Sequence, residues 1–147
     1  MRDLVRRHLH EWAQDAYAQL RQLVWELHAD TYGYDGVHQA MRAFDSDPRP
    51  AWPLLDRLVS DYRFGELDHD DAIALLQPVA QWIAEILIRI HGARWDVVAD
   101  GQRFAHVVVL DGGARQLDPY AFVAQYSQAQ LPSVADIARR AQEHIQR

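Results

Sequence analysis

The sequence predicts a mostly helical α+β fold from three observations. The first 28 residues carry one apolar stripe at helical spacing, and a segment near the middle of the chain is apolar on nearly all sides. After Gly92 the apolar period changes to two, which is typical of β-strands. We therefore expect a long N-terminal helix and a central buried helix, packed with a small antiparallel β-hairpin or three-stranded meander near the C-terminus.

Residues 3–28 are expected to form the long N-terminal helix. Apolar residues recur at spacings of three and four, and polar residues fill the remaining positions, so the helix has a single face to bury. The stripe consists of Leu9, Trp12, Ala13, Ala16, Leu20, Leu23, Val24 and Leu27. Because it is so long, a second copy of the chain covering part of it is one alternative.

A turn-rich segment should separate this helix from two shorter ones. Two glycines and two aspartates between residues 29 and 36 favour a loop. We expect Asp35 to cap a helix over 37–44. The run Asp-Ser-Asp-Pro-Arg-Pro then breaks the chain before a further helix over 51–63.

The central helix is predicted over 70–91. Asp68 is placed to cap it, and Asp70 and Asp71 complement the positive end of the helix dipole. Its interior residues are Val, Ile, Leu and Trp on nearly every side, which indicates a helix buried in the core. Gly92 supplies the stop.

Two strands follow, over 95–99 and 103–110, rich in Val and aromatic residues. They are joined around Asp100-Gly101, a strong hairpin signal. A short third strand is expected over 114–117. Two more helices should end the chain, one opened by Pro119 and running to about residue 127, the other capped by Ser133 and running to about residue 146.

The second half of the chain also resembles certain small bacterial domains of unknown function. The resemblance is carried by Gly-Ala-Arg-Trp at 92–95, the Asp-Gly hairpin, Asp-Gly-Gly at 111–113 and Leu-Asp-Pro at 117–119. It covers about residues 70–147 and implies a buried helix that leads through a Gly-Ala-x-Trp entry into a β-meander. No activity comes with it.

The composition is that of one globular domain. Of 147 residues, 49% are hydrophobic and 24% charged, and there is no linker and no internal repeat, so we expect residues 1–147 to form a single domain. The absence of Cys excludes disulfides, thiolate metal sites and a Cys nucleophile. The N-terminus lacks a secretory signal, and the longest apolar stretch contains charges and is too short to span a bilayer, so we expect a soluble, cytoplasmic protein without a membrane partner.

All 15 basic residues are Arg, and the chain has neither Lys nor Asn, which favours a GC-rich bacterial genome. The net charge is −6, and no cluster of basic residues stands out. Phosphate neutralisation requires such a cluster, so we expect no nucleic-acid partner.

The densest group of possible metal ligands is a run of acids before the central helix. It consists of Glu66, Asp68, His69, Asp70 and Asp71. This run lacks the alternating acids, central Gly and closing Glu of a calcium loop, and no H-x-x-x-H or H-E-x-x-H pair exists in the chain. We interpret the run as a helix cap with solvated acids, and we expect no metal and no cofactor.

Glu85 lies in the most apolar part of the central helix, where a carboxylate is costly unless it is paired. Arg89 is four residues further on, so an ion pair on the one exposed stripe of the helix is favoured. As an alternative, Glu85 is a tuned acid in a pocket between the central helix and the meander, with His91 and His106. For His106 itself we expect the solvent face of its strand.

The most aromatic loop region, together with Trp52 nearby in the sequence, supplies the residues that we predict to bind a partner. They are Tyr32, Tyr34, Asp35, His38 and Trp52. Tyr and Trp in breaker-rich segments suit a recognition surface, although anchoring of the loop itself is an alternative.

No catalytic motif is present: there is no G-x-S-x-G, no phosphate-binding loop and no Ser-His-Asp pattern. The sequence therefore favours a non-enzymatic bacterial interaction module, of the adaptor, immunity or inhibitor type, with a basic partner protein. The alternatives are a small-molecule pocket or weakly signalled enzyme using Glu85, His91 and His106, and a homo-oligomer built on the N-terminal helix.

Overall fold

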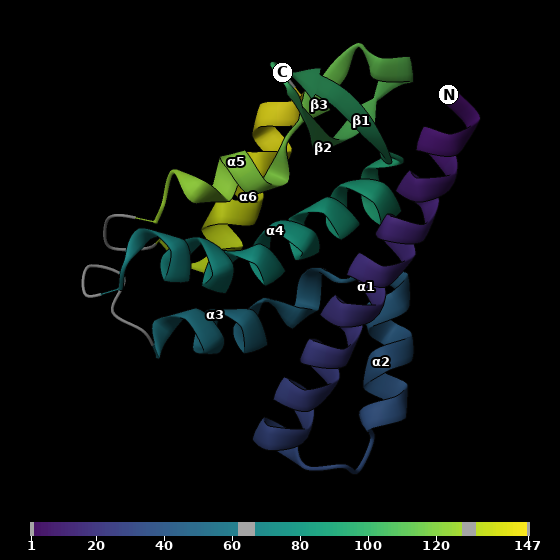
Figure 1. Cartoon of the computed structure of the whole chain (residues 1–147). Coiled ribbons are helices and arrows are strands. Elements are labelled where there is room, and N and C mark those ends of the chain that lie inside the picture. The colour runs from purple at the N-terminus through teal and green to yellow at the C-terminus, as the bar shows by residue number, and fades with distance from the viewer. Residues whose placement is uncertain (1, 62–66, 128–131, 147) are drawn as a thin grey trace.

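A computed structural model describes residues 2–61, 67–127 and 132–146 (Figure 1). The α+β prediction is confirmed, with a long first helix, a central helix and a three-stranded antiparallel sheet. The elements are α1 (Arg2–Tyr32), α2 (Val37–Ser46), the 3₁₀-helix η1 (Arg49–Ala51), α3 (Trp52–Ser60), α4 (His69–His91), β1 (Arg94–Asp100), β2 (Arg103–Leu110), the 3₁₀-helix η3 (Asp111–Gly113), β3 (Arg115–Leu117), α5 (Pro119–Ala124) and α6 (Val134–Gln146).

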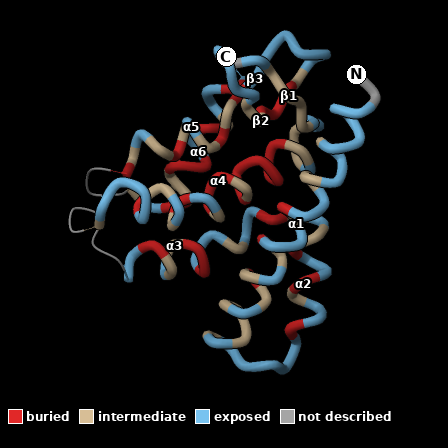
Figure 2. The backbone as a smooth tube through the Cα atoms, in the orientation of Figure 1, coloured by how far each residue is buried: buried red, intermediate tan, exposed pale blue. Residues whose placement is uncertain are grey.

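Helix α4 is the centre of the core. The side chain of Asp68 caps it by accepting a hydrogen bond from the backbone N–H of Asp71 (2.9 Å), and Gly92 ends it with φ of 76°. Buried residues of the other five helices and of the sheet join those of α4 in one hydrophobic cluster, which runs through the middle of the molecule (Figure 2).

By length and composition alone, α4 is also long and apolar enough to cross a membrane: it has 23 residues, and the mean hydropathy of an 18-residue window within it is 1.4. This differs from the expectation drawn from its apolar core segment. Half of the window is buried inside the protein, and α4 contacts α1, α3, α5 and α6. We interpret it as a core helix.

Helix α1 runs along one side of the molecule, and α2 folds back against it to form a helical hairpin (Figure 1). Helix α1 extends four residues beyond the predicted end at residue 28. Two contacts explain the difference: Arg57 of α3 donates to the hydroxyl of Thr31 (3.1 Å), and within α1 the rings of Tyr32 and His28, one turn apart, lie 5.0 Å from one another. The predicted cap by Asp35 is wrong, because Gly36, with φ of 75°, is the N-cap of α2.

The three strands lie in the order β1-β2-β3. The hairpin closes on the pair Asp100 and Arg103, so its two turn residues are Gly101 and Gln102, one residue later than predicted. Gly101 has φ of 65°, as a tight turn requires. Strand β3 pairs only with the last three residues of β2.

The last two helices close one end of the sheet. Helix α5 begins at Pro119 as predicted and ends at Ala124, about one turn early. The predicted cap of α6 is confirmed: the hydroxyl of Ser133 accepts from the backbone N–H of Asp136 (3.1 Å).

Candidate functional site

The three aromatic residues predicted to bind a partner are all on the surface. The exposed fractions are 64% for Tyr32, 72% for Tyr34 and 41% for Trp52. Tyr32 ends α1, Tyr34 lies in the following loop and Trp52 begins α3. Large exposed aromatic side chains are costly to leave in water, so they mark a candidate recognition surface.

A hollow of about 220 Å³ lies between α1, α2 and the start of α3, and we call it the α1–α3 cleft. Its lining residues are Val24, His28, Tyr32, Ala40, Met41, Ala43, Phe44, Asp47, Pro50, Ala51, Pro53 and Leu54. All but His28, Tyr32 and Asp47 are apolar. Trp52 lies between two lining residues in the chain, so the cleft and two of the exposed aromatics occupy one region.

The predicted binding residues do not form a single patch. The ring of Tyr34 packs against Trp25 of α1, with centroids 5.7 Å apart. A second hollow of about 280 Å³ is lined by Arg21, Gln22, Trp25, His38 and Met41. The two hollows share only Met41. Tyr32 therefore lines the cleft, and Trp52 is next to its lining residues in the chain. His38 lines the second hollow, Tyr34 contacts Trp25 of that hollow, and Asp35 lies in the exposed loop.

The end of α1 carries negative charge where a helix ordinarily prefers positive charge. No basic residue lies in its last turn, and Asp30 is exposed there. The carbonyl groups at a helix C-terminus already carry about half a negative charge, and Asp30 adds to this negative potential, although the guanidinium of Arg57 at Thr31 (3.1 Å) offsets part of it. Asp47, by contrast, is paired with Arg49 (2.8 Å), whose hydrogen bond lowers the pKa of the carboxyl.

Polar side chains between α1, α2 and α4 form a network around Asp45. Arg21 donates two hydrogen bonds to the carboxylate of Asp45 (2.9 and 3.1 Å), and Tyr17 donates a third. Arg89 donates to the backbone carbonyl of Asp45, and its guanidinium lies over the ring of Tyr17 (4.4 Å). The hydrogen bond from Arg21 lowers the pKa of Asp45, and burial raises the pKa of Tyr17.

Glu85 belongs to this network through Arg89. The predicted pair is confirmed, with Nε of Arg89 2.9 Å from the carboxylate. Its predicted place on an exposed stripe is wrong, because Glu85 is only 7% exposed. Burial raises the pKa of Glu85, and the hydrogen bond from Arg89 opposes this. Glu85 is buried while the side chain of Arg89 stays partly exposed and reaches across to α2, a contact that the sequence of α4 does not reveal.

His91 and His106, the other residues of the alternative pocket, have different partners. The ring nitrogens of His91 contact Gln142 (2.9 Å) and Gln146 (3.1 Å) of α6. The ring of His106 stacks on Trp12 of α1 at 3.7 Å. The predicted solvent face for His106 is therefore wrong.

Trp12 is the centre of an aromatic cluster that sequence reasoning missed. The ring of Trp95 meets it edge-on at 4.8 Å, and Tyr120 lies 6.4 Å from both Trp rings. Burial within this cluster lowers the pKa of His106, and the charge of Asp118 opposes the shift. The cluster joins α1, the sheet and α5, and its only sequence signal was the place of Trp12 in the apolar stripe.

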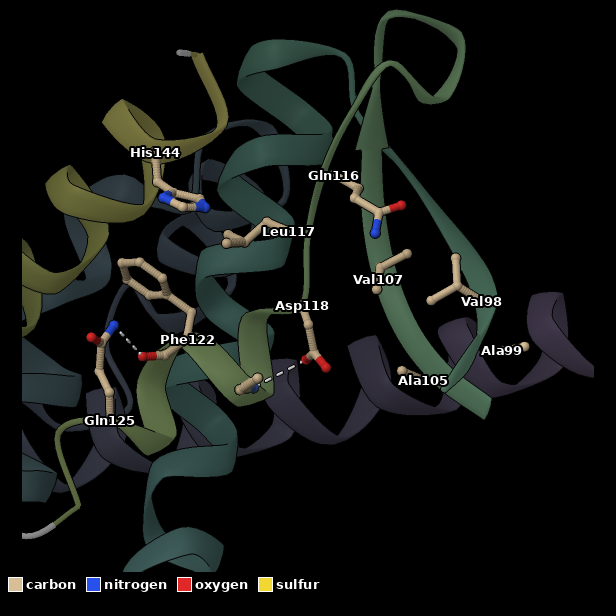
Figure 3. Close-up of a pocket in the computed structure, with 11 residues that line it drawn as sticks. Val98, Ala99, Ala105, Val107, Gln116, Leu117, Asp118, Phe122, Gln125 and His144 are labelled. Atoms are coloured by element: carbon tan, nitrogen blue, oxygen red, sulfur yellow. Dashed lines mark hydrogen bonds between the residues drawn. The ribbon is translucent and has the colours of Figure 1, made fainter. Parts of the chain in front are cut away.

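A larger hollow of about 540 Å³ lies between the sheet and helices α5 and α6, and we call it the sheet trough (Figure 3). It is lined by Val98, Ala99, Ala105, Val107, Gln116, Leu117, Asp118, Ala121, Phe122, Gln125 and His144. Glu85, His91 and His106 line neither the trough nor the α1–α3 cleft.

The acidic run before α4 is a helix start. Asp68 is its cap, and Glu66 lies outside the described residues. Across residues 2–61, 67–127 and 132–146, no group of three or more His, Asp or Glu side chains is arranged to hold a metal ion. Comparisons with models of protein families, with curated proteins and with solved structures found no match.

Proposed function

We propose that the protein is a non-enzymatic interaction module, of the adaptor, immunity or inhibitor type, that binds a partner protein at the α1–α3 cleft. The observation that carries the proposal is the apolar cleft with Tyr32, 64% exposed, in its lining and Trp52 beside it. Interface hot spots are enriched in Tyr and Trp and lie around well-packed pockets.

The size and lining of the cleft favour a side chain over a cofactor. Small-molecule sites are commonly about 300–1,000 Å³, and a cavity of about 150 Å³ holds a benzene ring. At about 220 Å³ the cleft suits one large apolar side chain of a partner. Val24, Met41, Phe44 and Leu54 give it a buried apolar floor.

Charge supports a basic partner. The net charge is −6, and Asp30 reinforces the negative end of α1 beside Tyr32. A Lys or Arg next to the apolar anchor would meet this potential, and complementary charge accelerates association and orients the partner. We infer a partner segment that carries an apolar side chain flanked by basic residues.

Site-specific photo-crosslinking in the native host tests the proposal. A photoreactive phenylalanine analogue at position 32 should capture a discrete protein, and the same analogue at Gln19, exposed on α1, should not. Equal capture at both positions, or capture only of a second copy of this chain, would contradict the proposal and, in the second case, favour the homo-oligomer.

Calorimetry with the purified partner then ranks the residues. We expect Tyr32→Ala or Trp52→Ala to weaken binding at least about thirtyfold, corresponding to about 2 kcal/mol. Glu85→Gln, His91→Gln and His106→Gln should stay within about threefold, with the melting temperature as a folding control. If the two aromatic variants bound normally and the variants of Glu85, His91 and His106 lost binding, the result would instead favour the alternative pocket.

A further inference from the structure

Strand β2 is longer than the strand that covers its outer edge. It spans the eight residues Arg103–Leu110, but β3 pairs only with Val108, Val109 and Leu110. Among the residues that the structure describes, the segment Arg103–Val107 therefore has a strand neighbour on the β1 side alone. On the other side, its edge presents backbone N–H and C=O groups at the regular spacing of a strand.

The cause of the short β3 lies in the residues that follow it. Asp118 accepts hydrogen bonds from the backbone N–H groups of Tyr120 (3.0 Å) and Ala121 (3.1 Å), which starts α5. Pro119 follows Asp118, has no N–H to donate and fixes the first helical turn. The chain thus leaves the sheet while β2 continues.

The open segment lacks the usual protection of an edge strand. Proteins shield such edges with charges, Pro or bulges. In Arg103–Val107 the sequence is Arg-Phe-Ala-His-Val, with one charge and no Pro. Phe104 is 70% exposed, which leaves an apolar ring in water beside the unpaired backbone.

The sheet trough lies beside this open segment. Val98, Ala105 and Val107 line it from the hairpin, and Asp118 and Phe122 line it from the start of α5 (Figure 3). The space thus begins where β3 stops. It shares no residue with the α1–α3 cleft.

We propose that the sheet trough binds an extended segment of a partner protein, which adds to β2 as a strand continuing the line of β3. Addition of a strand satisfies the open backbone groups and accommodates alternate side chains in pockets. This proposal concerns a second surface and does not depend on the function proposed for the cleft.

The side chains around the trough define the chemistry of the segment. Running antiparallel to β2, as β3 does, the segment enters beside Val107 and leaves beside Arg103. Asp118 uses Oδ1 for the cap, so Oδ2 can accept from a basic residue near the entry. An apolar residue then meets Val107 and Phe122, and an acidic residue meets Arg103. We expect the order basic, apolar, acidic.

Two other occupants fit less well. Edge-to-edge pairing with a second copy of the chain would have to bring a whole sheet against β2. Helices α5 and α6 form the opposite wall of the trough and stand in the way of such a sheet (Figure 3). A small molecule can fill about 540 Å³, but it would leave the row of backbone groups along β2 without strand partners.

Selection from a random 12-residue peptide library displayed on phage tests the proposal on the wild-type chain. We expect enriched peptides with the order basic, apolar, acidic. On binding of a synthetic copy, amide hydrogen exchange should slow at alternate residues within Arg103–Val107, because only alternate N–H groups of a strand point to one edge. Exchange at the cleft should be unchanged.

Variants give an independent measurement. Ala105→Arg, at a half-buried position that lines the trough, should reduce peptide affinity at least tenfold, with the melting temperature as a folding control. Asp118→Glu should reduce it less than Asp118→Ala. Tyr32→Ala should leave it unchanged, which separates this surface from the cleft. Three results would overturn the proposal. The first is a selection that enriches no peptide beyond a bait-free control, and the second is slowed amide exchange at residues away from β2. The third is a dimer, detected by sedimentation velocity, whose contacts cover β2.

Discussion

Asp45 is the residue on which α1, α2 and α4 converge. Its carboxylate accepts from Arg21 and Tyr17, and its backbone carbonyl accepts from Arg89. None of these partners is within 20 residues in the chain, and the nearest, Arg21, is 24 residues away. The sequence predicts the Glu85–Arg89 pair because its spacing is local, but it cannot predict the residues that the fold brings to it.

Asp45→Asn is expected to destabilise the protein by about 1 kcal/mol at pH 7, because a charge-assisted interaction is lost at a site that water partly screens. The pKa of Asp45 is lowered from 3.8, first by the hydrogen bond from Arg21. The ionised form is therefore favoured in the folded state. Its contribution is present above pH 3.8 and is lost as the pH falls through the folded value.

Urea denaturation at pH 7, 4 and 3 measures this effect. The difference between the wild type and Asp45→Asn should narrow below pH 4. Asp15→Asn, at an exposed position of α1, is the matched control and should change stability by less than about 0.5 kcal/mol. If the difference in unfolding free energy between the wild type and Asp45→Asn did not change with pH, the charge of Asp45 would not be what stabilises the network.

The pKa of His106 is also lowered, from 6.5, but by burial, and for a histidine this favours the neutral form in the folded state. The unfolded chain then takes up a proton at a higher pH than the folded one, so stability is lost as the pH falls through about 6.5. His106→Phe keeps a ring against Trp12 and removes the proton site. Its melting temperature should fall less between pH 7.5 and 5 than that of the wild type, whereas His10→Gln, at an exposed position, should behave like the wild type.

At the scale of elements, local sequence signals predict that a helix or strand exists, and which of the two it is, better than they predict the residues at which it begins and ends. The cap of α4 and the cap of α6 follow from Asp68 and Ser133, whose side chains bond within the next three residues. The end of α1 depends on contacts with α3 and with its own preceding turn, so periodicity alone stops it four residues early. The hairpin was predicted one residue out of place, because Asp100 pairs as a strand residue.

Gly101 tests the hairpin by conformation alone. Its φ is 65°, and outside Gly101 and its two chain neighbours no heavy atom lies within 4 Å of the position that a Cβ would take. Any loss on substitution therefore reports backbone strain and not a clash. We expect Gly101→Val to cost about 1–3 kcal/mol and Gly101→Asn clearly less, because Asn tolerates positive φ.

Urea denaturation of the two variants beside the wild type provides the measurement. Gln102→Val, at the second turn position, is a useful comparison because Gln102 does not have a positive φ, so Val should not strain the backbone there. If the two Gly101 variants were equally stable, positive φ at this position would not be what holds the turn.

At the scale of the whole molecule, three of the exposed aromatic residues could be predicted, whereas exposed Phe104 and the hollows could not. Tyr32, Tyr34 and Trp52 stand in breaker-rich segments, where a fold has little use for buried rings. The cleft, however, combines residues from Val24 to Leu54, and its shape depends on how three helices meet. The trough depends in the same way on where β3 stops beside β2.

Trp82 connects the core to the cleft. It is 1% exposed, and its Nε1 donates to the backbone carbonyl of Pro48 (2.7 Å). Pro48 lies between Asp47 and Pro50, with Arg49 as the one residue between the two prolines, and both Asp47 and Pro50 line the cleft. The same carbonyl accepts from the N–H of Ala51 (3.2 Å), so one indole holds the segment that leads from α2 to α3.

Trp82→Ala should destabilise the protein by about 3–5 kcal/mol, through lost burial and the cavity left behind. Trp82→Phe should cost less in stability, but it removes the hydrogen bond to Pro48, and the exchange of the Ala51 amide should accelerate more than that of core amides in α4. Ile86→Ala, which leaves Pro48 untouched, is the matched control: it should cost about 2–5 kcal/mol without selective loss of protection at Ala51. A loss below about 0.5 kcal/mol for both alanine variants would exclude α4 from the core. Equal acceleration at Ala51 in Trp82→Phe and Ile86→Ala would mean that general packing, and not the indole, holds the wall of the cleft.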